Sequence, residues 1–262
     1  MDFIQRAIDK ARIQRDSIIA APLGDARPRA TPRVAPVAAI EYTQTRVVQP
    51  DPRHLASELV IAGIDDERSE VYRQLRTQVL RKMREQGWRK LAISSPNSHA
   101  GKSLTALNLA ISMSKEVNQT VLLIDLDLRN PTIARKLGIE VELDLIDYIE
   151  GRAELKDVLV NPGFERLVVL PNSHRATHRS ELLSSPRMSA FMQEIVERYD
   201  SRLIIFDLPA VLDDDDMLMF APFADALLMV IEEGVSQRAD LERALNLMHG
   251  TPLLGTVLNK TR

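Results

Sequence analysis

Gly101, Lys102 and Ser103 have the residue types and the order of a phosphate-binding turn. A glycine lets the backbone approach an anion closely, a lysine reaches the β- and γ-phosphates, and a hydroxyl can hold Mg²⁺. The complete pattern of such a loop starts with another glycine, and Pro96 stands at that position here. Because Gly-Lys-Ser occurs by chance in many proteins, its meaning depends on the elements that flank it.

Three aspartates follow apolar runs that could be buried strands. Asp125 and Asp127 follow the run 121–124, and Asp207 ends the run 202–207. The carboxyl ends of parallel strands meet at one edge of a sheet, so these carboxylates could gather around one metal–phosphate centre. Any one of them could instead cap a helix that follows its strand. Three together with Gly-Lys-Ser favour a magnesium–nucleotide site.

The elements that would position these residues alternate along the chain. The apolar run 91–93 predicts a buried strand before the loop, and apolar residues at helical spacing over 104–111 predict a helix after it. Further strands are expected at 167–170, 226–231 and 255–258, and further helices at 69–86, 144–149, 186–198 and 238–249. This alternation predicts an α/β fold with a mostly parallel sheet covered by helices on both faces.

The first part of the chain differs in composition from this body. Residues 1–20 predict an amphipathic helix, which could dock on its own domain, on a neighbouring subunit or on a membrane surface. Residues 21–58 are rich in Pro, Ala and Arg and predict an extended linker. The expected catalytic domain is therefore 59–262.

Composition excludes several classes of function. The 262 residues are 45% hydrophobic and 27% charged, which is enough for a packed core. They include no cysteine, which excludes disulfides, cysteine-ligated zinc and thiol catalysis. The net charge of −3 argues against general nucleic-acid binding. Since no apolar run could span a bilayer and no signal pattern is present, we expect a cytoplasmic protein with no transmembrane segment of its own.

The ordered motifs resemble those of the bacterial tyrosine kinases of capsule and exopolysaccharide assembly, a family of MinD/ParA-like P-loop ATPases. The resemblance extends over roughly residues 59–259 and implies a P-loop NTPase fold. Residues 1–15 also resemble the leader of a soluble subgroup from exopolysaccharide loci. The matching segments are Glu70-Val-Tyr-Arg73-Gln-Leu-Arg76, Gly101-Lys102-Ser103, Asp125-Leu-Asp127-Leu-Arg-Asn-Pro131, Leu170-Pro171 with Glu181-Leu-Leu, Asp207-Leu-Pro-Ala-Val-Leu with Asp216, and Val257-Leu-Asn259.

This resemblance implies a role for each candidate residue. ATP would lie against Ser98, His99, Ala100, Gly101, Lys102, Ser103 and Leu104, with Asn259 at the adenine. Catalysis would rest on Lys102, Asp125 and Asp127, the last orienting or deprotonating the tyrosine hydroxyl. Mg²⁺ would be held by Ser103, Asp125 and Asp207. Glu70, Arg73 and Arg76 would join copies of the chain into a ring. The implied partner is the cytosolic segment of a membrane polysaccharide co-polymerase, which would hold this protein near the membrane.

Two departures from the family pattern keep other functions open. Where the family's loop reads Pro-Gly-Glu-Gly-Lys, this chain has Ser98-His99-Ala100-Gly101-Lys102, and a side chain at position 99 could crowd a phosphate. The family's C-terminal tyrosine cluster is absent, and among Tyr42, Tyr72, Tyr148 and Tyr199 the most accessible acceptor is expected to be Tyr42. A catalytically weak scaffold or regulator of the same family is therefore the second hypothesis. A MinD/ParA-type positioning ATPase is the third and weakest, because Asn97 stands where that class carries a lysine.

Overall fold

The computed structural model describes residues 45–64, 66–117, 119–173, 179–198, 202–213 and 216–261. The helix expected at 1–20, most of the expected linker, and the tyrosines Tyr42 and Tyr199 lie outside these residues. Within them, no helix has both the length and the hydropathy that crossing a membrane requires.

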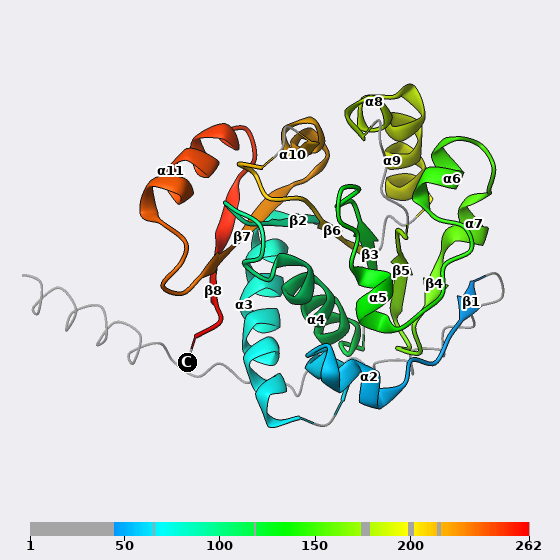
Figure 1. Cartoon of the computed structure of the whole chain (residues 1–262), viewed down its shortest axis with the longest axis horizontal. Coiled ribbons are helices and arrows are strands. Elements are labelled where there is room, and N and C mark those ends of the chain that lie inside the picture. Colours follow the sequence, from blue (N-terminus) through cyan, green and yellow to red (C-terminus); the bar gives the residue numbers. More distant parts are fainter. Residues whose placement is uncertain are drawn as a thin grey trace, which may run out of the picture. The chain divides into compact units, whose positions relative to one another are not determined.

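An eight-stranded sheet runs through the described part of the chain (Figure 1). The strands are β1 (Arg46–Val47), β2 (Lys90–Ser94), β3 (Val121–Asp125), β4 (Val160–Asn161), β5 (Leu167–Leu170), β6 (Leu203–Asp207), β7 (Ala226–Glu232) and β8 (Leu253–Asn259). They lie in the order β1-β4-β5-β3-β6-β2-β7-β8, and every pair is parallel except β4 with β5. The prediction of a mostly parallel sheet is confirmed.

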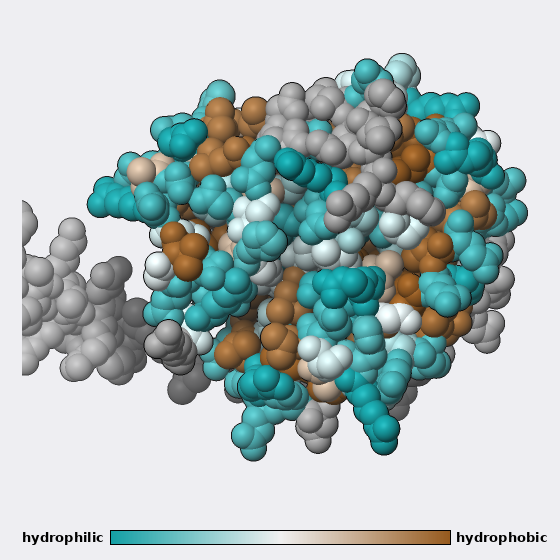
Figure 2. Space-filling view, in the orientation of Figure 1, coloured by the Kyte–Doolittle hydropathy of each residue, from teal (hydrophilic) through white to brown (hydrophobic). Residues whose placement is uncertain are grey.

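Helices cover both faces of this sheet. The α-helices are α2 (Pro52–Ser57), α3 (Glu70–Gln86), α4 (Lys102–Ser114), α5 (Ile133–Leu137), α6 (Leu145–Ile149), α7 (Leu155–Val158), α8 (Arg179–Leu183), α9 (Pro186–Arg198), α10 (Asp216–Phe220) and α11 (Arg238–Leu247). Short 3₁₀ helices lie at Ile61–Gly63, Glu67–Ser69 and Ala221–Phe223. One hydrophobic cluster joins the sheet to α2, α3, α4 and α5, and a second joins its other face to the helices from α6 to α11. Figure 2 shows a face on which hydrophilic residues predominate and hydrophobic ones are scattered.

The central strands β2, β3 and β6 are apolar along most of their length because both of their faces are covered. Leu91 and Ile93 of β2 belong to the first hydrophobic cluster, whereas Ala92 between them belongs to the second. Successive side chains of a strand point to opposite faces, so a strand between two helical layers has no polar side. The predicted strands at 91–93, 121–124 and 202–207 are found on this basis in β2, β3 and β6.

The ordered body includes residues that the sequence analysis assigned to the linker. Strand β1 pairs in parallel with β4, and α2 packs beside α5, so the sheet and its helical cover include residues before 59. Asp51 caps α2 by accepting the backbone N–H of Arg53 at 2.9 Å, and Pro52 occupies the first turn. A proline is compatible with that position because the amide it lacks would have no partner within the helix. Pro52 therefore begins a helix here.

A buried asparagine fixes the helix that follows the phosphate loop. Asn108 of α4 accepts the backbone N–H of Ala62 at 2.8 Å and donates to the carbonyls of Leu59 and Leu104 at 3.0 and 3.1 Å. Its side chain uses the oxygen and both amide hydrogens, so none of its polar groups is left unpaired in the core. These bonds join the chain at 59–62 to α4 and hold that helix in place.

Candidate nucleotide-binding site

The loop between β2 and α4 contains two residues with left-handed backbone conformation. His99 has a φ of 70° and Gly101 a φ of 91°. Such angles cost a glycine little, whereas the Cβ of a histidine makes them strained. None of the backbone amides of residues 99–104 donates a hydrogen bond to another described residue. The loop and the first turn of α4 therefore offer a row of free donors at the positive end of a helix, which is a site for phosphate.

Side chains from distant parts of the chain hold this loop. Asn97 donates to Asp240 at the start of α11 at 2.8 Å, and Asn259 at the end of β8 donates to the carbonyl of Ala100 at 2.9 Å. A Cβ at Gly101 would lie 2.1 Å from the amide nitrogen of Asn259, so this contact requires a glycine there. Asn259 was expected at the adenine, and here its amide nitrogen contacts the loop itself.

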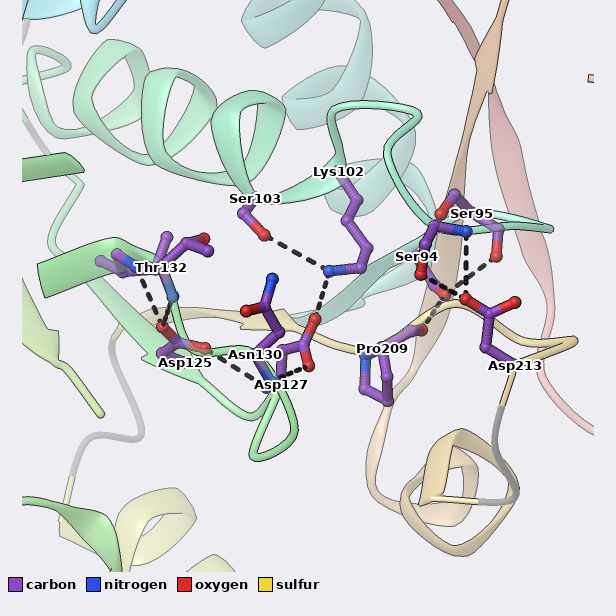
Figure 3. Close-up of polar contacts among 12 residues, drawn as sticks. Ser94, Ser95, Lys102, Ser103, Asp125, Asp127, Asn130, Thr132, Pro209 and Asp213 are labelled. Atoms are coloured by element: carbon purple, nitrogen blue, oxygen red, sulfur yellow. Dashed lines mark hydrogen bonds and ion pairs between the residues drawn. The ribbon is translucent and has the colours of Figure 1, made fainter. Parts of the chain in front are cut away.

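Lys102 and Asp127 form a buried ion pair at the base of the loop (Figure 3). The Nζ atom of Lys102 lies 2.5 Å from Oδ2 of Asp127 and 3.4 Å from Oγ of Ser103. Burial lowers the pKa of Lys102, but the carboxylates of Asp207 and Asp127 outweigh it and raise that pKa above its usual value. The amine is therefore a cation that faces several carboxylates.

Asp125 and Asp207 end neighbouring strands and are paired in register. One oxygen of Asp125 accepts the backbone N–H groups of Thr132 and Ile133, each at 3.0 Å, and so caps the start of α5. Asp125 therefore caps a helix, and its role at a metal or nucleotide site stays a prediction. Burial, with repulsion from Asp207, raises the pKa of Asp125 well above its usual value. Burial also raises the pKa of Asp207 to about 6, against the opposing effect of Lys102.

A cleft of about 550 Å³ opens beside Lys102 and Asp127, whereas Asp125 and Asp207 are fully buried and do not line it. It is lined by Ser98, His99, Lys102, Asp127, Arg129, Asn130, Pro209, Ala210 and Asp213. The loop donors, a lysine and an aspartate thus face one open space, as binding and transfer of a phosphoryl group would need.

Comparisons with known proteins show which family this chain belongs to. The family model described as an AAA domain matches residues 88–243, more than half of the chain. The tyrosine-protein kinase CpsD of Streptococcus agalactiae is 30% identical over 173 residues, which are 65% of this chain and 74% of that protein. This chain belongs to the bacterial tyrosine-kinase family. That family lies within the P-loop ATPases, as the sequence motifs predicted.

Two further similarities bear on the extent of this family match. The kinase domain of the Escherichia coli tyrosine kinase ETK superposes with a TM-score of 0.70 at 26% identity, covering 76% of this chain and 79% of that one. The succinoglycan biosynthesis transport protein ExoP of Rhizobium meliloti is 32% identical over 181 residues, or 66% of this chain. The match spans 22% of ExoP, so most of that protein lies outside the region that resembles this chain.

The donor set of this kinase-family site fits Mg²⁺ in the presence of a phosphate. Both carboxylate oxygens of Asp207 are buried, and neither makes a hydrogen bond of normal geometry in the described part of the chain, although Lys102 and the Ser103 hydroxyl lie near enough to lower its pKa. A buried carboxylate without such hydrogen bonds suits a cation or its bound water. Among the described residues, no cluster of three or more His, Cys, Asp and Glu side chains could hold a metal. Mg²⁺ commonly takes one or two carboxylates and completes its shell with phosphate and water, so Asp207, Asp125 and Ser103 are sufficient only with the nucleotide.

The three residues expected at a subunit interface are placed differently from one another. Glu70 and Arg73 lie exposed on α3 and pair with each other. Arg76 instead donates to the carbonyl of Ser112 at 3.0 Å and lies 3.1 Å from Glu116, with its side chain 17% exposed. Arg76 therefore joins α3 to the end of α4 within one chain. The role of all three in a ring stays a prediction.

Five cleft residues were not assigned to the site from the sequence. Arg129 and Asn130 follow Asp127, and Pro209 and Ala210 follow Asp207, so their position just after a strand-end aspartate was the available signal. The fifth is Asp213, the first of four consecutive aspartates in the sequence. It is exposed, but its carboxylate accepts hydrogen bonds from Ser98 in the phosphate loop.

Replacing His99 with glycine should tighten the binding of Mg·ATP several-fold. Glycine adopts a φ of 70° without steric cost and removes an imidazole from the lining of the cleft. The free energy of unfolding should change by less than about 1 kcal/mol, because relief of strain is offset by greater freedom of the unfolded chain. Calorimetric titration and urea unfolding measure the two effects. His99→Ala is the matched control, since it removes the ring but keeps the Cβ; equal affinity for the histidine and glycine proteins would contradict the prediction.

Proposed function

We propose that this chain binds Mg·ATP and transfers its γ-phosphoryl group to tyrosine hydroxyls of proteins. The observation that carries the proposal is the buried Lys102–Asp127 pair beside six loop amides with no partner among the described residues. One side of the cleft thus offers donors for phosphate, and the other offers a carboxylate for the hydroxyl that attacks it. Kinship with tyrosine-protein kinases supports this assignment.

The ion pair suggests how binding and catalysis are linked. A γ-phosphate against the loop competes with Asp127 for the ammonium of Lys102, because both are anions within its reach. The carboxylate of Asp127 is then released from Lys102, so it can orient the tyrosine hydroxyl and accept its proton. The tyrosine oxygen bonds to the γ-phosphorus, the bond from that phosphorus to the bridging oxygen breaks, and ADP leaves. Mg²⁺ held by Ser103, Asp125 and Asp207 would neutralise charge on the phosphate oxygens.

We further infer that the protein acts in polysaccharide polymerisation and export, under the control of a membrane co-polymerase. ExoP, whose name describes succinoglycan biosynthesis and transport, contains a region similar to this chain within a much longer protein. Contact with such a co-polymerase would keep this chain at the cytoplasmic face of the membrane. Glu70 and Arg73 are exposed on α3 and would take part in contacts between copies in a ring.

A catalytically weak regulator of the same pathway is the second candidate. The observation in its favour is the strained backbone of His99, which stands among the residues that line the cleft. Such a protein would bind nucleotide and change its oligomeric state or its partner contacts without rapid phosphoryl transfer.

Phosphotyrosine formation distinguishes the two candidates. The purified chain is incubated with Mg·ATP and a tyrosine-containing copolymer, and both protein and copolymer are probed for phosphotyrosine. We expect a signal that Asp127→Asn lowers by about a hundredfold or more while nucleotide binding persists. Asp66→Asn, at a cap that asparagine also satisfies, is the matched control and should keep full activity. Tight ATP binding without phosphotyrosine would favour the regulator, and failure to bind ATP would exclude both.

A further inference from the structure

We propose that Asp213 is a positioning residue for the phosphate loop. Its carboxylate holds Ser98 and thereby keeps the strained turn at His99 in the conformation that presents the loop amides to a phosphate. This inference rests on the proposed function, because the loop is taken to be the phosphate site. It adds a residue that neither the motifs nor the strand-end aspartates indicated.

The contact joins the loop to the segment that follows β6. The backbone N–H of Ser98 donates to Oδ2 of Asp213 at 3.2 Å, and the hydroxyl of Ser98 donates to the same oxygen. The backbone N–H of Asp213 donates to the carbonyl of Ala210 at 3.2 Å, which closes a turn directly after Pro209. Figure 3 shows Asp213 beside Ser94, the last residue of β2, and Ser95, the first residue of the loop that follows. A charged acceptor with two donors from one residue fixes that residue more firmly than a neutral contact would.

The contact with Asp213 matters because Ser98 lies directly before the strained residue His99. Ser98 immediately precedes His99, whose φ of 70° a non-glycine residue keeps only where neighbouring contacts impose it. Asn97 is held before it by Asp240, and Ala100 is held after it by Asn259. Among the described residues, the hydrogen bonds to Asp213 are what hold Ser98, which lies between Asn97 and the strained His99. Without them, the peptide joining Ser98 to His99 could rotate and turn the following amides away from the cleft.

The carboxylate leaves the phosphate donors free. It takes the amide of Ser98, whereas the amides of residues 99–104 remain without partners in the described part of the chain. The guanidinium of Arg129 lines the same cleft and lies 3.5 Å from the backbone carbonyl of Asp213, so a cation offsets the negative charge at this point. Asp213 therefore shapes the loop without occupying the place of the ligand.

Binding titrations in two backgrounds test the proposal. Asp213→Ala should weaken Mg·ATP and Mg·ADP about three- to tenfold, the effect of losing a charge-assisted hydrogen bond near the surface. Asp213→Asn keeps an oxygen that can accept from Ser98 and should lose much less. In a His99→Gly protein the turn needs no external restraint, so Asp213→Ala should have little effect there. This dependence on residue 99 would not arise from a general loss of stability.

Amide hydrogen exchange of residues 97–101 in the nucleotide-free protein provides a readout that does not depend on ligand binding. Asp213→Ala should speed exchange in this segment, and Asp213→Asn should not. Tighter ATP binding by Asp213→Ala would overturn the inference, because it would show that the carboxylate only repels phosphate. An equal loss of affinity in the wild-type and His99→Gly backgrounds would also overturn it, and so would unchanged amide exchange at residues 97–101. If the wild-type protein bound no nucleotide, both the proposed function and this inference would fail. If it bound nucleotide and Asp213→Ala bound it equally well, only this inference would fail.

Discussion

Replacing Lys102 with alanine should lower the rate of phosphotyrosine formation by about a hundred- to a thousandfold and weaken Mg·ATP binding. The ammonium of Lys102 faces the carboxylates of Asp127, Asp125 and Asp207. Without it, a triphosphate would meet three acidic side chains with no cation from α4 to offset them. The rate is measured with a tyrosine copolymer and the affinity by calorimetry, at several Mg²⁺ concentrations.

Two controls separate this loss of charge from a loss of fold. Lys156→Ala removes an exposed lysine that pairs with Glu154 and does not line the cleft, and it should leave the rate unchanged. Lys102→Ala also leaves Asp127 buried without its partner, which should cost about 3 to 5 kcal/mol of unfolding free energy. The double variant Lys102→Met with Asp127→Asn removes both charges and should recover most of that stability without recovering activity. A Lys102→Ala protein that phosphorylates tyrosine at the wild-type rate would contradict this account.

The position of the strand-end aspartates could be predicted because parallel strands impose it. The runs at 121–124 and 202–207 each end in an aspartate, and their pairing brings Asp125 opposite Asp207 at the end of the sheet beside α4. The apolar run before the loop and the helical spacing after it likewise predicted β2 and α4. These features follow from local sequence and from the geometry of a sheet covered on both faces.

The shape of the loop could not be predicted because distant residues determine it. Ser98, Asn97 and Ala100 bond to partners 115, 143 and 159 positions away, and no local pattern announces such pairs. The two-residue strands β1 and β4 were missed for a related reason, since so short a segment has no periodicity. The prolines near residue 52 indicated a linker, although one of them begins α2.

Asp207→Asn should make the folded protein more stable at neutral pH while it impairs Mg²⁺-dependent nucleotide binding. Both oxygens of Asp207 are buried without a hydrogen bond of normal geometry among the described residues, and Lys102 and Ser103 offset only part of the cost of burying its charge in the absence of ligand. Burial raises its pKa from the usual 3.8 to about 6, which corresponds to about 3 kcal/mol. The neutral amide avoids that cost but offers a cation no charge.

The dependence of this effect on pH follows from proton binding. Between pH 3.8 and about 6 the folded wild-type protein binds more protons at Asp207 than the unfolded chain does, so its stability falls as the pH rises through that window. Asparagine does not titrate, so the advantage of Asp207→Asn should be small near pH 4, grow up to about pH 6 and stay constant above pH 7. Urea unfolding of both proteins from pH 4.5 to 8 measures this difference.

Asp144 supplies the matched control for a buried aspartate that has partners. Its carboxylate accepts the backbone N–H groups of Ile146, Asp147 and Ser173 and the hydroxyl of Ser173. Asp144→Asn should therefore destabilise the protein at neutral pH, the opposite of the change at 207, because an amide accepts these bonds less strongly. If Asp207→Asn were also destabilising at pH 7, attraction between Asp207 and Lys102 would exceed the cost of burial. The folded protein would then need this carboxylate even without a cation.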